Sequence, residues 1–183
     1  MANKAIQFTY DDYLLFPYDR NRHEIIEGEH YMTPSPALYH QDISRNLQRI
    51  LVEFVEAHNL GKIYDAPVDV VLSDINVVVP DLVFVSAARA SILLEKYIAG
   101  APDLIVEILS ESTKKIDRDL KLKLYAKFDV SEYWIVDPKG KTVIVHRLAE
   151  GGYSEAKSFA ETEELVSSTF PGLRVPLALV FRK

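Results

Sequence analysis

Apolar residues recur at helical spacing along one segment in the first third of the chain. The positions that form this stripe are Ile43, Leu47, Ile50, Leu51, Phe54 and Val55. Such spacing predicts an amphipathic helix with one face on the core. Ser35 and Pro36 supply an N-cap and a first-turn proline, so we expect the helix to begin there. Before it, residues 8–32 surround Glu27-Gly28 with tyrosines, histidines and acids, which predicts a short helix and then a hairpin-like turn.

Two valine-rich runs follow the break at Gly61. Residues 62–72 and residues 77–85 both have the composition of strands. Ser86 then predicts the cap of a further helix, which we expect to run through Ala99.

The second half of the chain continues the alternation of strands and helices. Residues 103–109 are rich in Leu, Ile and Val and predict a buried strand, and residues 114–128 predict a helix. Residues 132–137 and 142–148 predict a hairpin, and residues 173–180 a last strand. The pattern therefore predicts an α/β (α+β) fold with one central mixed sheet flanked by helices, in a single domain of residues 1–183.

Composition narrows the classes of protein that this chain can be. With 183 residues, of which 48% are hydrophobic, the chain can bury one sizeable core without disulfide or metal staples. It contains no cysteine, which excludes a disulfide framework, cysteine-ligated zinc, iron–sulfur clusters and a thiol nucleophile. The absence of cysteine fits a reducing compartment, and we expect a cytoplasmic protein.

The ends and the charge of the chain bear on location and partners. The first 20 residues contain acids and tyrosines where a signal peptide needs a continuous apolar stretch, and no apolar run approaches the ~18 residues of a membrane span. We therefore expect neither export by that route nor a membrane protein. A pI near 5.4 argues against broad electrostatic capture of nucleic acid, but it permits a local basic groove or a metal that bridges acids to phosphate.

Two acids stand where the local pattern favours apolar residues. Asp81 follows Pro80 inside the second valine-rich run, and Glu107 shares a strand face with Ile105 and Leu109. A lone buried carboxylate costs several kcal/mol unless it is protonated, paired or bound to a cation. Either acid alone could face a solvated cleft or pair with a buried Arg or Lys. Both together, on neighbouring strands, are suited to Mg²⁺ or Mn²⁺, which prefer oxygen ligands.

The helix after Glu107 adds a basic residue. Asp117, Lys121 and Tyr125 lie four residues apart on one face, next to an apolar stripe. The lysine could reach back over the end of the sheet. On spacing alone it could equally snorkel to the surface and pair with Asp117.

These residues together resemble a large bacterial family whose members carry the description "putative restriction endonuclease" and have the PD-(D/E)XK restriction-endonuclease-like fold. The resemblance is carried by the ordered set Pro80-Asp81, Glu107-Ile108-Leu109-Ser110, Asp117, Lys121, Tyr125 and the run from Glu132 to Pro138. It extends over nearly the whole chain, including His23 to Glu29, His40-Gln41 and Phe170 to Leu173.

The resemblance implies roles for particular residues. Asp81 and Glu107 would hold the divalent metal, with the main-chain carbonyl of Ile108 as a further ligand. The basic motif of the superfamily has a lysine two residues after the acid, where this chain has Leu109. Lys121 would replace that lysine and stabilise charge on the phosphate or orient the attacking water.

The same resemblance implies three supporting residues. Tyr125 would contact the active-site residues rather than the metal. Glu24 matches a recurrent acid that would bind metal or position water, although a surface hairpin acid is an equal alternative. His40 matches a recurrent histidine, for which we favour hydrogen bonding or phosphate contact, because the other histidines form no metal-ligand pattern.

The leading hypothesis is a metal-dependent DNA endonuclease, which uses Mg²⁺ or Mn²⁺ to activate a water that attacks the phosphodiester bond. Superfamily members often pair so that two sites address two strands, which implies a homodimer. The motifs GxxxxGK[ST], GxSxG and HExxH are absent, so we expect no nucleotide cofactor.

Two alternatives to this hypothesis are an inactive nuclease-fold module that binds DNA or protein, and a nuclease for RNA or branched DNA. Local positive potential would come from Arg45, Arg49, Lys114, Lys115 and Arg118.

Overall fold

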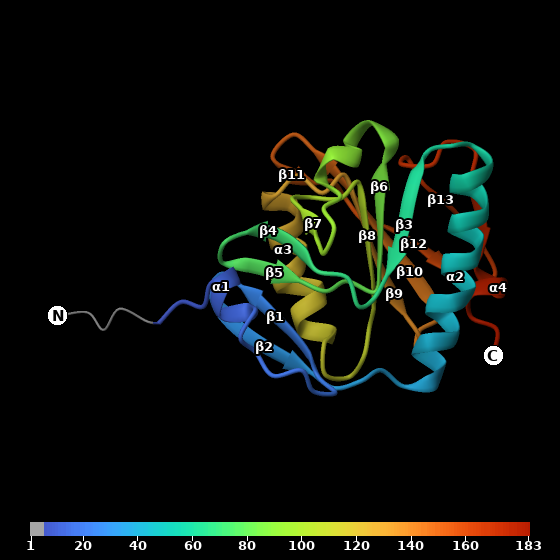
Figure 1. The fold of residues 1–183 in the computed structure, drawn as a ribbon. Coiled ribbons are helices and arrows are strands. Elements are labelled where there is room, and N and C mark those ends of the chain that lie inside the picture. The colour runs from blue at the N-terminus through green and yellow to red at the C-terminus, as the bar shows by residue number, and fades with distance from the viewer. Residues whose placement is uncertain (1–5) are drawn as a thin grey trace.

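A mixed seven-stranded sheet forms the centre of the computed structural model, which describes residues 6–183 (Figure 1). Its strands run in the order β11-β10-β9-β8-β6-β3, and β12 pairs with β10. Among the described residues, β8 and β9 are the only parallel neighbours in this sheet. The bounds are β3 (Gly61–Asp65), β6 (Leu82–Ser86), β8 (Leu104–Ile108), β9 (Glu132–Asp137), β10 (Thr142–Ala149), β11 (Gly152–Tyr153) and β12 (Lys157–Ala160). Residues 1–5 of the predicted domain lie outside the described residues.

The predicted central mixed sheet is confirmed, and a second sheet of five strands accompanies it. Its order is β2-β1-β5-β4-β7, and a third, two-stranded sheet pairs β13 with β14. Each valine-rich run is divided between the two larger sheets, because Pro67 and Pro80 cannot donate to a strand ladder. The bounds are β1 (Arg22–Ile26), β2 (Glu29–Thr33), β4 (Val70–Ser73), β5 (Asn76–Val78), β7 (Ile98–Ala99), β13 (Glu164–Val166) and β14 (Arg174–Pro176).

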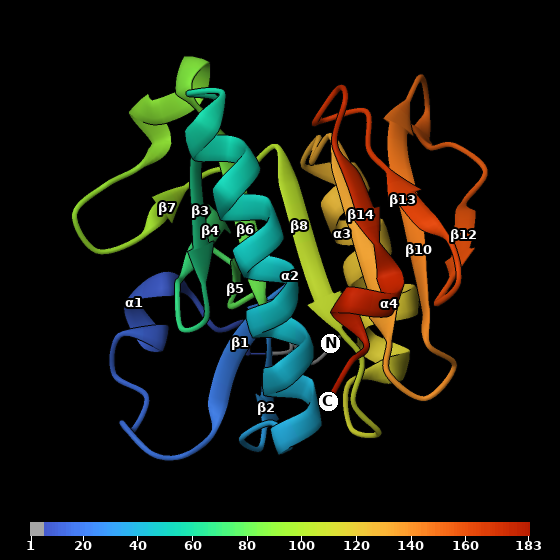
Figure 2. The ribbon, with the colours of Figure 1, turned by 90° about the vertical axis from the view of Figure 1, so that its right-hand side faces the viewer.

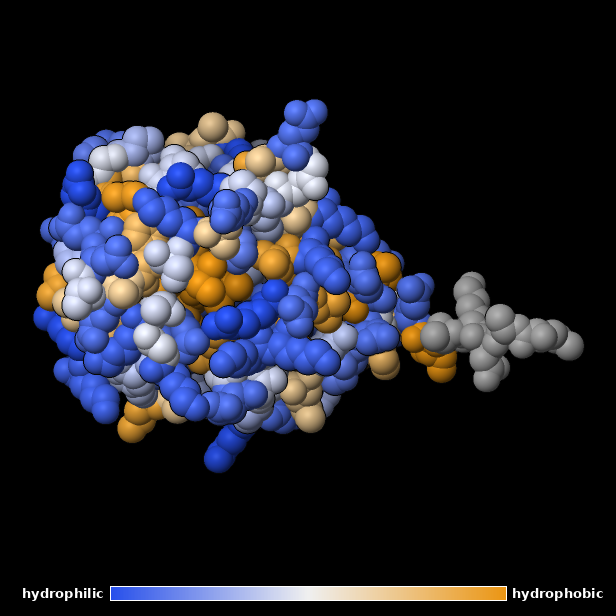
Figure 3. All heavy atoms as spheres, turned by 180° about the vertical axis from the view of Figure 1, so that it is seen from behind, coloured by the Kyte–Doolittle hydropathy of each residue, from blue (hydrophilic) through white to orange (hydrophobic). Residues whose placement is uncertain are grey.

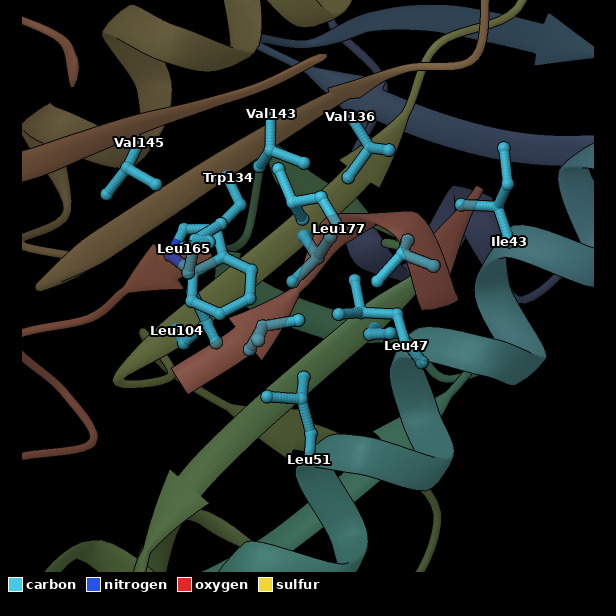
Figure 4. Close-up of a cluster of buried hydrophobic side chains, with 14 of the residues drawn as sticks. Ile43, Leu47, Leu51, Leu104, Trp134, Val136, Val143, Val145, Leu165 and Leu177 are labelled. Carbon is cyan, nitrogen blue, oxygen red and sulfur yellow. The ribbon is translucent and has the colours of Figure 1, made fainter. Parts of the chain in front are cut away.

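Helix α2 (Leu38–Ala57) covers one face of the central sheet (Figure 1). The predicted stripe is confirmed: Ile43, Leu47, Leu51 and Val55 are buried, and Figure 4 shows the first three near Trp134 and Val136 of β9. The predicted start is wrong, since the helix begins after Ala37, and the hydroxyl of Ser35 donates to the carbonyl of Arg20 instead. The C-terminal helix α4 (Leu177–Val180) lies beside α2 (Figure 2).

Helix α3 (Lys121–Lys127) and the second sheet lie on the opposite face of the central sheet (Figure 1). The predicted helix of residues 114–128 contains a π-helical turn, η2 (Ile116–Leu120), that continues into α3. Some apolar side chains of this layer, such as Leu122 and Phe128, are only partly buried. Figure 3 views the molecule from behind, where hydrophilic residues surround a central group of apolar ones.

Three further predictions are decided by the remaining segments. The short helix α1 (Tyr10–Tyr13) and the hairpin of β1 and β2 are confirmed, with Glu27 and Gly28 in the turn at positive φ. The helix predicted to run from Ser86 to Ala99 is wrong. A 3₁₀ helix, η1 (Ala87–Ile92), ends early because buried Ile98 pairs with β4 in the second sheet.

The strand predicted at residues 173–180 is wrong in its second half, since β14 ends at Pro176 and α4 follows. Among residues 6–183, no helix combines the length and the apolar content that crossing a bilayer requires.

Candidate active site

Asp81 and Glu107 face each other at one end of the central sheet. Asp81 stands at the junction where the chain leaves the second sheet and enters β6, and Glu107 lies in β8. The two strands are antiparallel, with Leu82 opposite Val106, so the acids occupy the next positions along the register. Both side chains are buried. The sequence pattern therefore places two carboxylates where β6 and β8 meet the second sheet.

Asp81 is held by three nitrogen atoms. Arg22 Nη2 donates to its Oδ1 at 2.9 Å, and the backbone N–H of Ile108 donates to its Oδ2 at 2.8 Å. His40 Nε2 lies 3.2 Å from Oδ2 and 3.0 Å from the carbonyl oxygen of Ile108. Both of these atoms are acceptors, so Nε2 carries the proton. Although burial opposes ionisation, the bond with His40 and the charge of Arg22 keep the pKa of Asp81 at about 2.

Glu107 accepts its bonds from the helix behind the sheet. Lys121 Nζ donates to Glu107 Oε1 at 2.8 Å, and the hydroxyl of Tyr125 donates to the same oxygen at 2.9 Å. Lys121 also donates to Glu24 Oε1 at 2.8 Å. Burial, together with the charges of neighbouring carboxylates, raises the pKa of Glu107 to about 8 against the attraction of Lys121.

Lys121 is the centre of this network and is 1% exposed. Its buried position would favour the neutral amine, but the charges of Glu107 and Glu24 hold its pKa well above the ordinary value. It does not snorkel to the surface. Its third acidic neighbour, Asp117, is farther away, with Oδ1 3.5 Å from Nζ, and burial raises the pKa of that carboxyl.

These groups surround a small cavity beside a larger cleft. The cavity has a volume of about 100 Å³, and Glu24, Asp81, Glu107, Asp117 and Lys121 are in its wall. The cleft has a volume of about 860 Å³ and lies between residues 13–23, the first half of α2 and residues 65–69. Arg22, His40 and Asp81 belong to both walls. The cleft and the cavity therefore adjoin each other at these side chains and at residues 34–36.

The seven residues for which the resemblance implies a role in the site come together here. Six of them are in the cavity wall, namely Glu24, His40, Asp81, Glu107, Ile108 and Lys121. The seventh, Tyr125, donates a hydrogen bond to Glu107. Their roles stay predictions. Arg22 was missed, although it lies two residues before Glu24 on the same face of β1. Of the predicted basic residues, Arg45 lines the cleft, while Arg118 pairs with Asp137 at 3.0 Å.

The residues present fit a divalent cation, which the restriction-endonuclease-like fold implies. Among residues 6–183, four buried carboxylates in the cavity wall, those of Glu24, Asp81, Glu107 and Asp117, face two permanent cations, Arg22 and Lys121. Within residues 6–183, no three His, Cys, Asp or Glu side chains are arranged to hold a metal ion. Mg²⁺ needs fewer, because it usually keeps several waters and binds through one or two carboxylates.

Comparisons with known proteins bear on the fold and the family. A crystal structure titled as a putative nuclease belonging to DUF820, from Anabaena variabilis, superposes with a TM-score of 0.78 at 25% sequence identity. The match covers 95% of this chain and 97% of that chain. The predicted restriction-endonuclease-like fold is thus confirmed. This neighbour and the family match given next both indicate a nuclease.

A comparison with curated protein sequences gives no significant match. The family model Uma2, described as putative restriction endonuclease, matches residues 10–179. Because this match spans most of the sequence, the chain belongs to the Uma2 family of putative restriction endonucleases.

Proposed function

We propose that this protein is a divalent-metal-dependent endonuclease that hydrolyses phosphodiester bonds in DNA. The observation that carries the proposal is the surplus of buried carboxylates around Asp81 and Glu107, directly beside an open cleft. Buried acids with perturbed pKa values in a cleft are typical of functional sites. Membership of the nuclease family supports a phosphodiester as the substrate.

In this proposal, Asp81, Glu107 and the carbonyl of Ile108 hold Mg²⁺ or Mn²⁺. Such an ion lowers the pKa of a bound water and neutralises charge on a phosphoryl group. Glu107 has its protein bonds on Oε1, which leaves Oε2 for a further ligand. Arg22 and the N–H of Ile108 fix the orientation of Asp81 from two sides.

Lys121 acts from beneath the carboxylates. Its ammonium holds Glu24 and Glu107 in one orientation, with both Nζ to oxygen distances at 2.8 Å. It also supplies a permanent positive charge where negative charge develops on the phosphate. Tyr125 and Glu24 fix this arrangement from the helix and the hairpin.

The cleft is where the nucleic acid would bind. Arg20, Arg22 and Arg45 bring positive side chains to its wall, and α2 adds the polar side chains of Gln41 and Gln48. Arginines contact phosphates and fix the register of the strand, whereas amide side chains hydrogen-bond to base edges. His40, in the wall shared with the cavity, would contact the phosphate next to Asp81.

The test is cleavage of supercoiled and linear DNA with Mg²⁺ or Mn²⁺. Asp81→Asn and Lys121→Met remove a charge with little change of shape, and Lys123→Met is a matched control because Lys123 is exposed on the same helix. We expect metal-dependent cutting that falls at least about 100-fold in the first two variants and is unchanged in the control. Circular dichroism checks their folding. Cutting at the wild-type rate by Asp81→Asn would overturn the proposal.

One observation favours a second candidate, the inactive module that binds DNA or protein. Several oxygens that would bind metal already have partners. Asp81 has Arg22, His40 and the N–H of Ile108, and the carbonyl of Ile108 has His40. Oε1 of Glu107 has Lys121. Isothermal titration separates the two candidates. A wild-type protein that binds oligonucleotides, but neither binds Mn²⁺ nor cuts DNA or RNA, would be the module.

The homodimer and the cytoplasmic location belong to the same proposal. Each copy has a complete set of Asp81, Glu107 and Lys121, so two copies would supply two sites for two strands. Sedimentation with and without duplex DNA measures the oligomeric state.

A further inference from the structure

Asp117 is a buried acid to which the proposed function gives no role. It lies in the π-helical turn η2, directly before the helix that carries Lys121 and Tyr125. Its side chain is 2% exposed and is in the wall of the small cavity, together with Asp81 and Glu107.

One oxygen of this carboxylate has no hydrogen-bond partner. Among the described residues, no donor reaches Asp117 Oδ1, although the atom is buried. The nearest cation, Lys121 Nζ, is 3.5 Å away and donates at 2.8 Å to two glutamates instead. A buried acceptor without a donor is costly, and native structures rarely retain one without a reason.

The backbone holds Asp117 firmly in this position. The N–H of Lys121 donates to the carbonyl of Ile116, as a π-helical turn requires. The carbonyl of Asp117 accepts a bond of 3.0 Å from the hydroxyl of buried Tyr133. Single π-helical turns are rare and occur frequently at functional sites. The unpartnered oxygen is therefore fixed by the fold rather than left at a loose chain end.

The volume of the cavity and the charges in its wall indicate what Asp117 Oδ1 binds. A volume of about 100 Å³ is enough for about three water molecules. The wall has more carboxylates than permanent cations, so positively polarised hydrogen atoms would be favoured there. The waters around a divalent cation have such hydrogens, and Mg²⁺ gives up its waters reluctantly.

We propose that Asp117 Oδ1 accepts a hydrogen bond from a water bound to the divalent cation of Asp81 and Glu107, and so contributes to cation affinity without touching the ion. This inference rests on the proposed function, because it needs a cation at that site. It agrees with the lack, in residues 6–183, of three acids arranged as direct ligands.

The test is calorimetric titration of the full chain with Mn²⁺ and with Mg²⁺. Asp117→Asn keeps the shape and removes the charge, and Asp119→Asn is the matched control, since Asp119 is exposed on the same turn. We expect the dissociation constant to rise about 10–100-fold in Asp117→Asn and to stay unchanged in the control. Asp117→Ser, which shortens the side chain, should show the same loss.

Urea unfolding without metal separates this role from a structural one. Removing one of four neighbouring acids should leave the metal-free protein as stable as the wild type, or more stable. If Asp117 serves only to pair with Lys121, Asp117→Asn will instead unfold at lower urea and bind metal normally, which would overturn the inference.

Titration also distinguishes failure of this inference from failure of the proposed function. If the wild type binds Mn²⁺, Asp81→Asn abolishes binding and Asp117→Asn does not weaken it, only the inference about Asp117 fails. If the wild type binds neither metal ion, both proposals fail.

Discussion

Two glutamates are fully buried in neighbouring strands, yet their surroundings are opposite. Glu107 is near the end of β8 on the face covered by α3, and Glu132 is at the start of β9 on the face covered by α2. Glu132 accepts bonds from Trp134 Nε1 at 2.6 Å and, on its other oxygen, from the N–H of Ser168 at 3.0 Å. The hydroxyl of Ser168 and the N–H of Thr169 donate to that second oxygen as well.

Around Glu107 the donors are few and the other acids are close. Lys121 and Tyr125 use the same oxygen of Glu107, and Lys121 is shared with Glu24. The negative charges of Asp117 and Asp81 act against the ionised form of Glu107. Both oxygens of Glu132 thus accept hydrogen bonds from donors of the chain. Glu107 instead shares the positive charge of Lys121 with other carboxylates. Burial alone therefore does not mark a site, whereas an unsatisfied group of acids does.

The largest expected effect is on the free energy of unfolding, when the charge of Glu132 or of Glu107 is removed. Glu132→Gln replaces an acceptor of several neutral N–H and O–H groups, so it should lower the free energy of unfolding by about 3 kcal/mol or more. At pH 5, Glu107→Gln should change it by no more than about 1 kcal/mol, because Lys121 retains Glu24 and Asp117. Urea unfolding in EDTA measures both. Equal losses would erase the distinction between the two acids.

Loss of DNA cleavage should be greater in Glu107→Gln than in Glu132→Gln, the reverse of the order for loss of stability. DNA cleavage should be lost in Glu107→Gln and kept, at temperatures where the protein is folded, in Glu132→Gln. Cleavage by Glu107→Gln at the wild-type rate would contradict the role of Glu107.

The next effect is the dependence of stability on pH. Burial raises the pKa of Glu107 from its ordinary 4.5 to about 8. The folded state thus holds this proton more tightly, and its contribution to stability is present below pH 4.5 and lost as the pH rises through about 8. Metal-free protein should therefore lose on the order of 3 kcal/mol between pH 5 and pH 8 through Glu107. Asp117, whose pKa burial also raises, acts in the same direction.

Other titratable groups also make the unfolding free energy depend on pH, so the measurement needs a control. Burial lowers the pKa of His30 and of His146, which acts in the opposite direction over the same range. The pKa of Asp81, at about 2, affects stability only in more acidic solution. The informative quantity is therefore the difference between wild type and Glu107→Gln in unfolding free energy at pH 5 and pH 8. A difference that does not change with pH would contradict the raised pKa.

The smallest expected effect is a change in stability that should not depend on pH, which makes it a reference for the two larger effects. Asp129 follows α3 with φ at 59°, a conformation that glycine adopts more easily. Asp129→Gly should raise the free energy of unfolding by about 0.5 kcal/mol, equally at pH 5 and pH 8, because it changes neither acid. Urea unfolding at both pH values checks this. A loss of stability would mean that the side chain of Asp129 makes a contact that offsets its backbone strain.

Much of the fold follows from local patterns in the chain. The stripe from Ile43 to Val55, the β1–β2 hairpin and the buried strand before Ser110 are confirmed, because periodicity and turn residues act over short distances. The predictions that fail are those decided by distant partners. Ile98 joins a strand of the second sheet instead of continuing a helix, and the two valine-rich runs cross from one sheet to the other.

The candidate site divides in the same way. The sequence by itself determined that Asp81 and Glu107 interrupt apolar strands and that Lys121 and Tyr125 share a helix face, since these facts depend only on residue spacing. Only the tertiary structure brought Glu24 within 2.8 Å of Lys121, 97 positions away, and set Arg22 against Asp81. It also decided that Glu132 accepts hydrogen bonds on both of its oxygens, whereas Glu107 accepts them on Oε1 from Lys121 and Tyr125. The physical reason is that the energy of a buried charge depends on every group around it, and those groups come from segments that only folding brings together.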